Sequence, residues 1–400
     1  MEHIGLIGCV RFKRSICLFV IILLTVFFPA AGLSAPKFMI KPKVSTGWRL
    51  DTNYYKTENN EREVYTYFVW PGIDFGYETA KSLIVLNYTL DAHYYDDKDS
   101  VPPDQDTDDL VGHTLSLRTS TKPFDRLTLG LDESFYKTRD PIHTDVLSNY
   151  EVREEYFINR LTPRIVYDFG RKFTAGLRYR WTEVDYSRDI EEDSAEHRGI
   201  FDLKYNLTPR LSLGLQYQHW EMDYDLNTSD YTSDQIGLGV ERRYKYFSFE
   251  VGGGYHYRSF DDSGLEDIDT FAYHVGVEGK KARSHIALRA EQNFDNYHEA
   301  GDYHKAQRVE LEVGHLFRGK LPATIEGVYQ NSDYEGVTTS GDREDDTYSI
   351  SASLGYIVTD WLTLTGAAGH EERDSNLAGL DYENEYFLIQ LDFTYDVGRR

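Results

Sequence analysis

From residue 38 onward, hydrophobic and polar residues alternate with a period of two along most of the chain. The alternation is clearest in the segments 211–218, 348–356 and 387–395. A period of two indicates β-strands that have one apolar and one polar face. These segments are about ten to fifteen residues long, whereas strands in soluble sheets average about five or six. Because a tilted strand of about nine to eleven residues crosses a bilayer, their length favours a transmembrane barrel.

The number of such segments predicts an all-β fold, an antiparallel up-and-down transmembrane β-barrel of about 18 strands. An even number of strands places both ends of the chain on one side of the membrane. The expected strand centres lie near Trp48, Val69, Leu86, Leu117, Leu131, Leu161, Leu177, Leu203, Leu215, Leu238, Val251, Val275, Leu288, Leu311, Ile325, Ala352, Leu364 and Leu391.

The connections between these segments alternate between short and long, which is typical of barrels with short periplasmic turns and longer external loops. Short connections include 122–126, 168–172, 206–210, 279–283 and 358–361, and long ones include 96–109, 137–155, 185–198 and 333–346. Acidic residues dominate the long connections and basic residues the short ones. An oriented membrane protein explains this segregation of charge, whereas a soluble propeller or sandwich does not.

Aromatic residues gather near the strand ends on the apolar side, for example Phe173, Tyr179 and Trp181. Rings with polar tips settle at lipid–water boundaries, so this placement predicts aromatic girdles. An ordinary β core is the other interpretation, because aromatic residues are also common there.

An apolar run, Ile16–Phe28, is preceded by basic residues and followed by small ones. This pattern predicts a secretory signal peptide over residues 1–35, cleaved between residues 31 and 35. Residues 36–400 then form the outer-membrane barrel. An uncleaved membrane anchor is the other interpretation of the run.

Composition narrows the class of protein further. Asp and Glu number 67 against 43 Lys and Arg, and the net charge of −24 disfavours non-specific nucleic-acid binding. The 32 Tyr and 21 Phe residues argue against a disordered chain. Both cysteines, Cys9 and Cys17, lie in the expected leader, so the mature chain has no disulfide or thiolate metal site.

One turn pattern recurs loosely at Tyr205–Gly214, Tyr356–Thr365 and Tyr167–Gly176. Together with the leader and the final aromatic strand, it resembles the outer-membrane β-barrel porin family often associated with exopolysaccharide systems of Gram-negative bacteria. The resemblance is one of pattern and covers essentially the whole mature chain. It implies an outer-membrane location and contacts with outer-membrane lipids, lipopolysaccharide, the barrel-assembly machinery and periplasmic polysaccharide-export proteins. One departure is that the chain continues to Arg400 instead of ending on an aromatic residue.

If the apolar residues face lipid, the alternate residues face the lumen, which in barrels of about 16 to 18 strands is an aqueous channel. The expected basic wall comprises Arg160, Arg164, Arg178, Arg180 and Lys204, and the expected acidic wall comprises Glu278, Glu291, Glu310, Glu312 and Glu326. The basic wall would guide acidic sugars or other anions. The other interpretation is that these side chains pair across strands with neighbours, including Asp202 and Arg289.

The sequence thus favours a passive, porin-like channel that carries a secreted polysaccharide or small solutes across the outer membrane. The family resemblance, and not the residues, favours polysaccharide. Two alternatives remain: a non-conducting barrel that binds at the surface or serves as a structural protein, and a soluble periplasmic β-repeat protein.

Metal binding has weak support. Asp104, Asp106 and Asp108 are candidate Ca²⁺ ligands, but the loop lacks the glycine and the bidentate Glu of a full calcium loop. The acidic segment 261–269 and a cluster of His298, Glu299, Asp302 and His304 are comparable candidates. Solvated acidic loops explain the same residues, so no metal site is expected.

Catalysis has little support either. The sequence contains no nucleophile elbow, phosphate loop, zinc-protease helix motif or dinucleotide fingerprint. His256, His274, His285 and His315 are available for proton transfer, but the sequence pairs none of them with a nucleophile. We therefore expect that the protein is not an enzyme.

Overall fold

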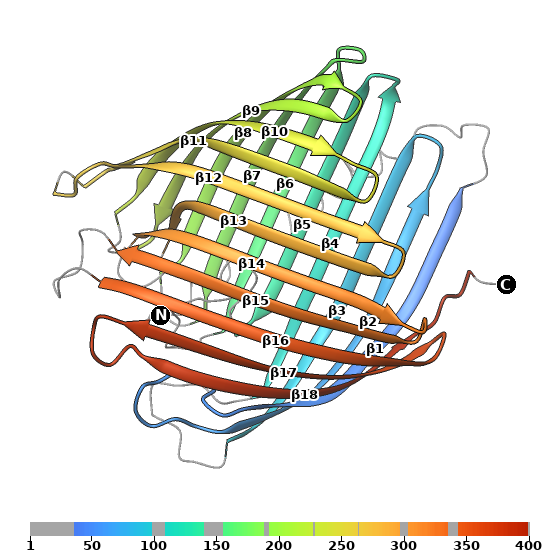
Figure 1. Cartoon of the computed structure of the whole chain (residues 1–400), viewed down its shortest axis with the longest axis vertical. Helices are drawn as coiled ribbons and strands as arrows, with labels where there is room; N and C mark the ends of the chain where they lie inside the picture. Colours follow the sequence, from blue (N-terminus) through green and yellow to red (C-terminus); the bar gives the residue numbers. More distant parts are fainter. Residues whose placement is uncertain are drawn as a thin grey trace, which may run out of the picture.

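The computed structural model describes residues 36–97, 109–139, 155–187, 192–226, 229–262, 264–296, 303–334 and 343–398. Eighteen strands form one sheet, and β1 pairs with both β2 and β18, which closes the barrel (Figure 1). Each strand pairs antiparallel with its neighbours in the sequence, so the topology is up-and-down. The predicted fold is confirmed.

The strands are 12 to 17 residues long, and each contains its predicted centre. Their bounds are β1 (Lys37–Asp51), β2 (Val64–Glu78), β3 (Ser82–Asp97), β4 (Leu110–Phe124), β5 (Leu127–Thr138), β6 (Tyr156–Asp168), β7 (Phe173–Tyr186), β8 (Ser194–Thr208), β9 (Leu211–Tyr224), β10 (Tyr231–Arg243), β11 (Phe247–Phe260), β12 (Ile268–Lys281), β13 (Ser284–Asn296), β14 (Tyr303–Phe317), β15 (Leu321–Tyr334), β16 (Arg343–Thr359), β17 (Leu362–Ser375) and β18 (Tyr382–Thr394).

The outward face of the barrel is apolar and exposed. The register aligns Leu203, Leu215 and Leu238 across β8, β9 and β10, and Leu238 is 67% exposed. Phe271 and Ile350, on more distant strands, are 62% and 58% exposed. A soluble protein rarely exposes apolar area on this scale, so this surface requires a cover such as lipid.

The predicted girdle residues share this outward face. Tyr179, between Leu177 and Trp181 on β7, is 45% exposed, and Tyr356 near the end of β16 is 46% exposed. Because they stand among exposed aliphatic side chains and not inside a packed core, the girdle interpretation fits the structure better than a β core does.

The two ends of the barrel differ. Short turns gather at one end, on the right in Figure 1, together with the C-terminus, and longer loops lie at the other end. Basic residues of the short turns are Lys81, Arg126, Arg171, Lys172, Arg210, Lys245, Arg283, Arg318 and Lys320. No helix long and apolar enough to cross a membrane occurs in the described part of the chain.

Strands extend further toward the loop end than the sequence predicted. β8 begins at Ser194, so Glu196 and Arg198 belong to a strand and not to the expected loop 185–198. Strand pairing continues there because the backbone groups bond to one another whether lipid or water surrounds them. The expected leader, residues 1–35, lies outside the described residues.

Candidate functional site

The candidate site is the barrel interior. All ten residues of the two expected walls have their side chains on the face opposite to the exposed apolar residues. The basic wall lies on β6, β7 and β8, where Arg164 pairs directly with Arg178. The acidic wall lies on β12 to β15, where Glu312 pairs directly with Glu326. The role of these ten residues in conduction stays a prediction.

Carboxylates on nearby strands meet four of the five basic side chains. The ion pairs are Arg164–Asp132 at 3.5 Å, Arg178–Asp202 at 2.8 Å, Arg180–Glu196 at 2.9 Å and Lys204–Glu241 at 2.5 Å. Arg160 donates to the hydroxyl of Thr182 at 3.3 Å. The sequence analysis gave such pairing across strands as the alternative to an unpaired basic wall. The pairing reduces the net positive charge that a solute meets.

The acidic wall is less completely neutralised. Glu278 and Glu310 both approach Arg289, at 3.2 and 3.7 Å. Among the described residues, Glu291 and Glu326 have no basic group within ion-pair distance. Both side chains are exposed to the lumen, so this wall keeps uncompensated negative charge.

Guanidinium groups stacked on aromatic rings line the loop end of the interior, a feature that the sequence did not predict. Arg198 lies 3.9 Å from the centre of the Trp220 ring, and Arg258 lies 4.0 Å from that of Tyr231. Such contacts contribute about 0.5–2 kcal/mol each, depending on how far they are desolvated. Arg258 and Trp220 are each only 2% exposed, so one partner of each stack is almost completely buried.

The loop between β1 and β2, residues 52–63, packs against the inside of the wall. Tyr54 and Tyr55 are 4% and 2% exposed and pack with Tyr95 of β3. On the other side, the Lys56 ammonium lies 2.5 Å from an oxygen of Glu371, which faces the lumen from β17. The loop therefore narrows the loop end of the channel.

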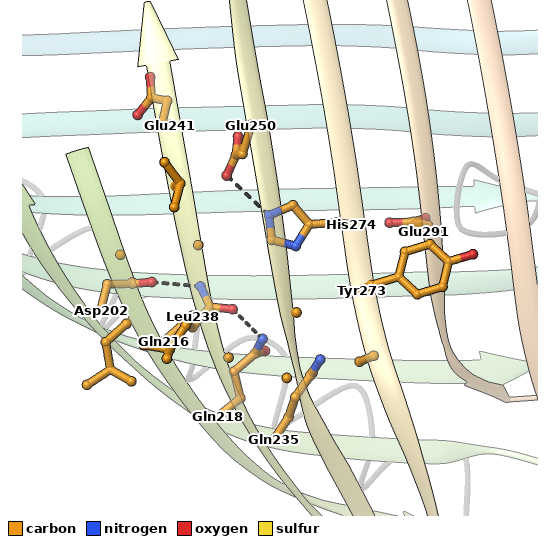
Figure 2. A pocket seen from close by; sticks show the side chains of 18 of the residues that line it. Asp202, Gln216, Gln218, Gln235, Leu238, Glu241, Glu250, Tyr273, His274 and Glu291 are labelled. Atoms are coloured by element: carbon orange, nitrogen blue, oxygen red, sulfur yellow. Dashed lines mark hydrogen bonds and ion pairs between the residues drawn. The ribbon is translucent and has the colours of Figure 1, made fainter. Parts of the chain in front are cut away.

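A cavity of about 440 Å³ opens in the inner wall between the basic and acidic walls. Figure 2 shows that amide and carboxyl side chains surround it, among them Gln216, Gln218, Glu250 and Glu291. The sequence did not predict this cavity, because its lining depends on which residues the register between strands brings together.

Candidate Ca²⁺ ligands Asp104, Asp106 and Asp108 lie outside the described residues, as do His298, Glu299 and Asp302. Within the described part of the chain, no group of three or more metal-ligating side chains occurs. In the acidic segment 261–269, the Tyr257 hydroxyl donates to Asp267 at 2.5 Å and lowers the pKa of that carboxyl below its ordinary value.

The four histidines occupy different environments. His256, His274 and His285 face the lumen, and His285 contacts Glu312 at 2.6 Å. His315 faces outward, and its Nδ1 lies 2.7 Å from the Ser284 hydroxyl, a pairing that the sequence did not indicate. No described carboxylate or amide hydrogen-bonds the other nitrogen of His315, so the pair lacks the third group that orients a catalytic base.

Residues 245–395 match the model of a family described as Putative beta-barrel porin 2. This segment of the chain is porin-like in sequence. The match runs from the turn before β11 to the end of β18, so the resemblance to a porin family is confirmed over this segment. Its extension over the rest of the mature chain and its association with exopolysaccharide systems stay predictions. Comparison with curated proteins gave no match.

Two solved structures from Pseudomonas aeruginosa share the fold. OccK2 (OpdF), in complex with glucuronate, is 10% identical at a TM-score of 0.52, and the match covers 90% of this chain and 98% of that one. OpdK with vanillate is 9% identical at a TM-score of 0.50, with 90% and 99% covered. At these identities the likeness shows the fold alone.

Proposed function

We propose that the protein is a porin-like channel of the outer membrane that passively conducts solutes or a polymer. The observation that carries this proposal is the two-faced wall of the eighteen-stranded barrel, which presents mainly apolar side chains outward and mainly polar and charged side chains inward. Lipid is the cover that such an outer face requires, and barrels of about 16 to 18 strands enclose water.

The barrel is oriented with its short basic turns in the periplasm and its long acidic loops outside. Single-chain bacterial barrels have this arrangement of connections. Outer-membrane lipids and lipopolysaccharide then surround the wall, the barrel-assembly machinery inserts it, and periplasmic polysaccharide-export proteins are candidate partners at the turn end.

The cargo that we favour is a saccharide, either a secreted polymer or a smaller solute. The family resemblance supports this choice. Arg160, Arg164, Arg178, Arg180 and Lys204 line one side of the path, and Glu291 and Glu326 line the other. Transport needs no catalytic group, and we assign none.

A planar-bilayer experiment tests the proposal. Purified protein is added to one chamber, and stepwise increases of ion current are recorded in about 1 M salt. Stepwise insertion of an ohmic conductance supports a channel. A folded protein that inserts and carries no current would refute it.

A non-conducting barrel is the second candidate, because the loop 52–63 occupies space inside the wall. The same recordings distinguish the two functions. A variant that lacks residues 54–62 would conduct where the intact chain does not if the loop seals the barrel.

A further inference from the structure

Three inward-facing glycines form the floor of the lumen cavity. Gly214 on β9 pairs directly with Gly239 on β10, and Gly237 lies two residues away along β10. A β-carbon added to Gly214 would meet nothing within 4 Å, and at Gly237 and Gly239 the nearest atoms would lie 3.7 and 3.5 Å away. None of the three has a positive φ.

These glycines therefore serve neither a turn nor a close approach of backbones. Glycine weakens a strand, so its clustering at one place requires another reason. Glycine at these positions keeps the cavity open, because a larger side chain at any of the three would fill it. The simplest function of such an open cavity is to hold a ligand.

The rim of the cavity offers both donors and acceptors of hydrogen bonds. The Gln216 amide donates to Asp202 at 2.7 Å, and the Gln218 amide donates to Gln216 at 2.6 Å (Figure 2). Gln235 and Asn293 add two further amides to the lining. A hydroxyl group both donates and accepts, so such a rim suits a polyhydroxylated molecule.

The charges around the cavity disfavour an anion. Lys204 is held by Glu241 and Arg198 by Glu196, each at 2.5 Å, whereas the Glu250 side chain is 60% exposed and has the imidazole of His274, at 3.4 Å, as its ion-pair partner in the described chain. Glu291 faces the cavity with no basic group within ion-pair distance in the described chain. A carboxylate entering this space would meet uncompensated negative charge, whereas a hydroxyl or an ammonium would not.

Two buried nitrogens without partners lie beside the cavity. Trp220 and His256 follow Gln218 and Gly254 at the next inward positions of β9 and β11, and they are 2% and 0% exposed. The His256 Nδ1 contacts Asn293 Oδ1 at 2.6 Å, which leaves Nε2 as an acceptor. Neither this Nε2 nor the Trp220 Nε1–H has a hydrogen-bond partner among the described residues.

Such a donor or acceptor is satisfied when a further polar group, such as water or a hydroxyl, comes within hydrogen-bond distance. The two side chains adjoin Gln218 and Gly254, which line the cavity, but they do not line it themselves.

We propose that this cavity is a saccharide subsite on the conduction path, selective for neutral and amino sugar units over uronate units. The proposal rests on the proposed channel function and names its substrate class. The amides would bind ring hydroxyls, Glu250 and Glu291 would attract an ammonium and repel a carboxylate, and the glycine floor would admit the sugar ring.

Two measurements test the subsite and the channel separately. Calorimetry on detergent-solubilised protein measures binding of hexamers of glucose, glucosamine and galacturonate, and bilayer recording measures their block of the ion current. We expect the first two hexamers to bind at least tenfold more tightly than the third. Gly237→Leu fills the cavity and should lower that binding at least tenfold.

Gln218→Ala is the second variant, because it removes an amide without adding volume, and it should weaken binding severalfold. Ser351→Leu is the matched control, since Ser351 faces the lumen from β16, far around the wall. The subsite proposal fails if Gly237→Leu binds as the wild type does, or if galacturonate binds best. Binding without any wild-type current would overturn the channel and leave the subsite standing.

Discussion

The ion pair that anchors the loop 52–63 to the inner wall makes a quantitative prediction. The side chains of Lys56 and Glu371 are 8% and 13% exposed, and Tyr382 donates a hydrogen bond to the same carboxyl oxygen at 2.5 Å. Replacing Lys56 with Met keeps the length of the side chain but leaves the carboxylate buried without its ammonium partner.

Breaking one side of a buried pair costs about 3–5 kcal/mol, because the remaining charge has been removed from water. The loop can relieve this cost by leaving the wall. At the lower figure, about 3 kcal/mol, the ratio of released to docked loop rises roughly a hundredfold, since about 1.4 kcal/mol corresponds to a factor of ten.

Tryptic cleavage after Arg62 measures that ratio. The Arg62 carbonyl accepts a hydrogen bond from the Tyr54 amide at 3.0 Å, so trypsin can cleave after Arg62 only when the loop has opened. Cleavage in Lys56→Met should be roughly a hundredfold faster than in the wild type, because the rate follows the open fraction when reclosing is fast. Single-channel conductance should also increase.

The double variant Lys56→Met, Glu371→Gln is the control. It removes both charges and leaves an acceptor for Tyr382, so cleavage should return most of the way to the wild-type rate. Equal cleavage rates and equal conductance in Lys56→Met and the wild type would refute the anchoring role of the pair.

Three further predictions concern charge and lipid. Reversing Arg178 and Arg180 to Glu should shift the reversal potential in a salt gradient toward cations, and an unchanged potential would contradict the basic-wall hypothesis. Glu291→Gln should reduce the preference of the channel for cations, because it removes a lumen carboxylate with no described cation partner. A cation preference equal to that of the wild type would contradict the proposed role of the acidic wall. Leu238→Arg, on the outward face, should lower the free energy of unfolding in lipid by about 2–4 kcal/mol, whereas Ser351→Arg, facing the lumen, should change it little. If urea titrations show that the two variants lose equal free energy of unfolding, the assignment of faces is contradicted.

The fold was predictable because every strand repeats the same two-residue pattern. Alternation alone places Leu177 outward and Arg178 inward, and it needs no knowledge of neighbouring strands. The inward orientation of both charged walls follows from the same pattern. Strand ends at the loop side were less predictable, since pairing continues there without the lipid that imposes alternation.

The partners inside the barrel could not be predicted, because they depend on register between strands. Lys204 reaches Glu241 across the intervening strand, where Gly214 provides no side chain. The glycine floor is invisible in a hydropathy pattern, because glycine contributes to neither face. The loop 52–63 has ordinary loop composition, and its inward packing depends on Tyr95 and Glu371, which are distant in sequence.

Fluorescence quenching by lipid tests the central claim most directly, namely that acyl chains cover the outward face. Of the five tryptophans, Trp181 faces outward between Leu161 and His197, whereas Trp220 faces inward and is 2% exposed. Variants that retain only one of these two are reconstituted in bilayers whose acyl chains carry bromine. We predict strong quenching of Trp181 and little quenching of Trp220. Equal quenching of the two, or none of Trp181, would contradict the account.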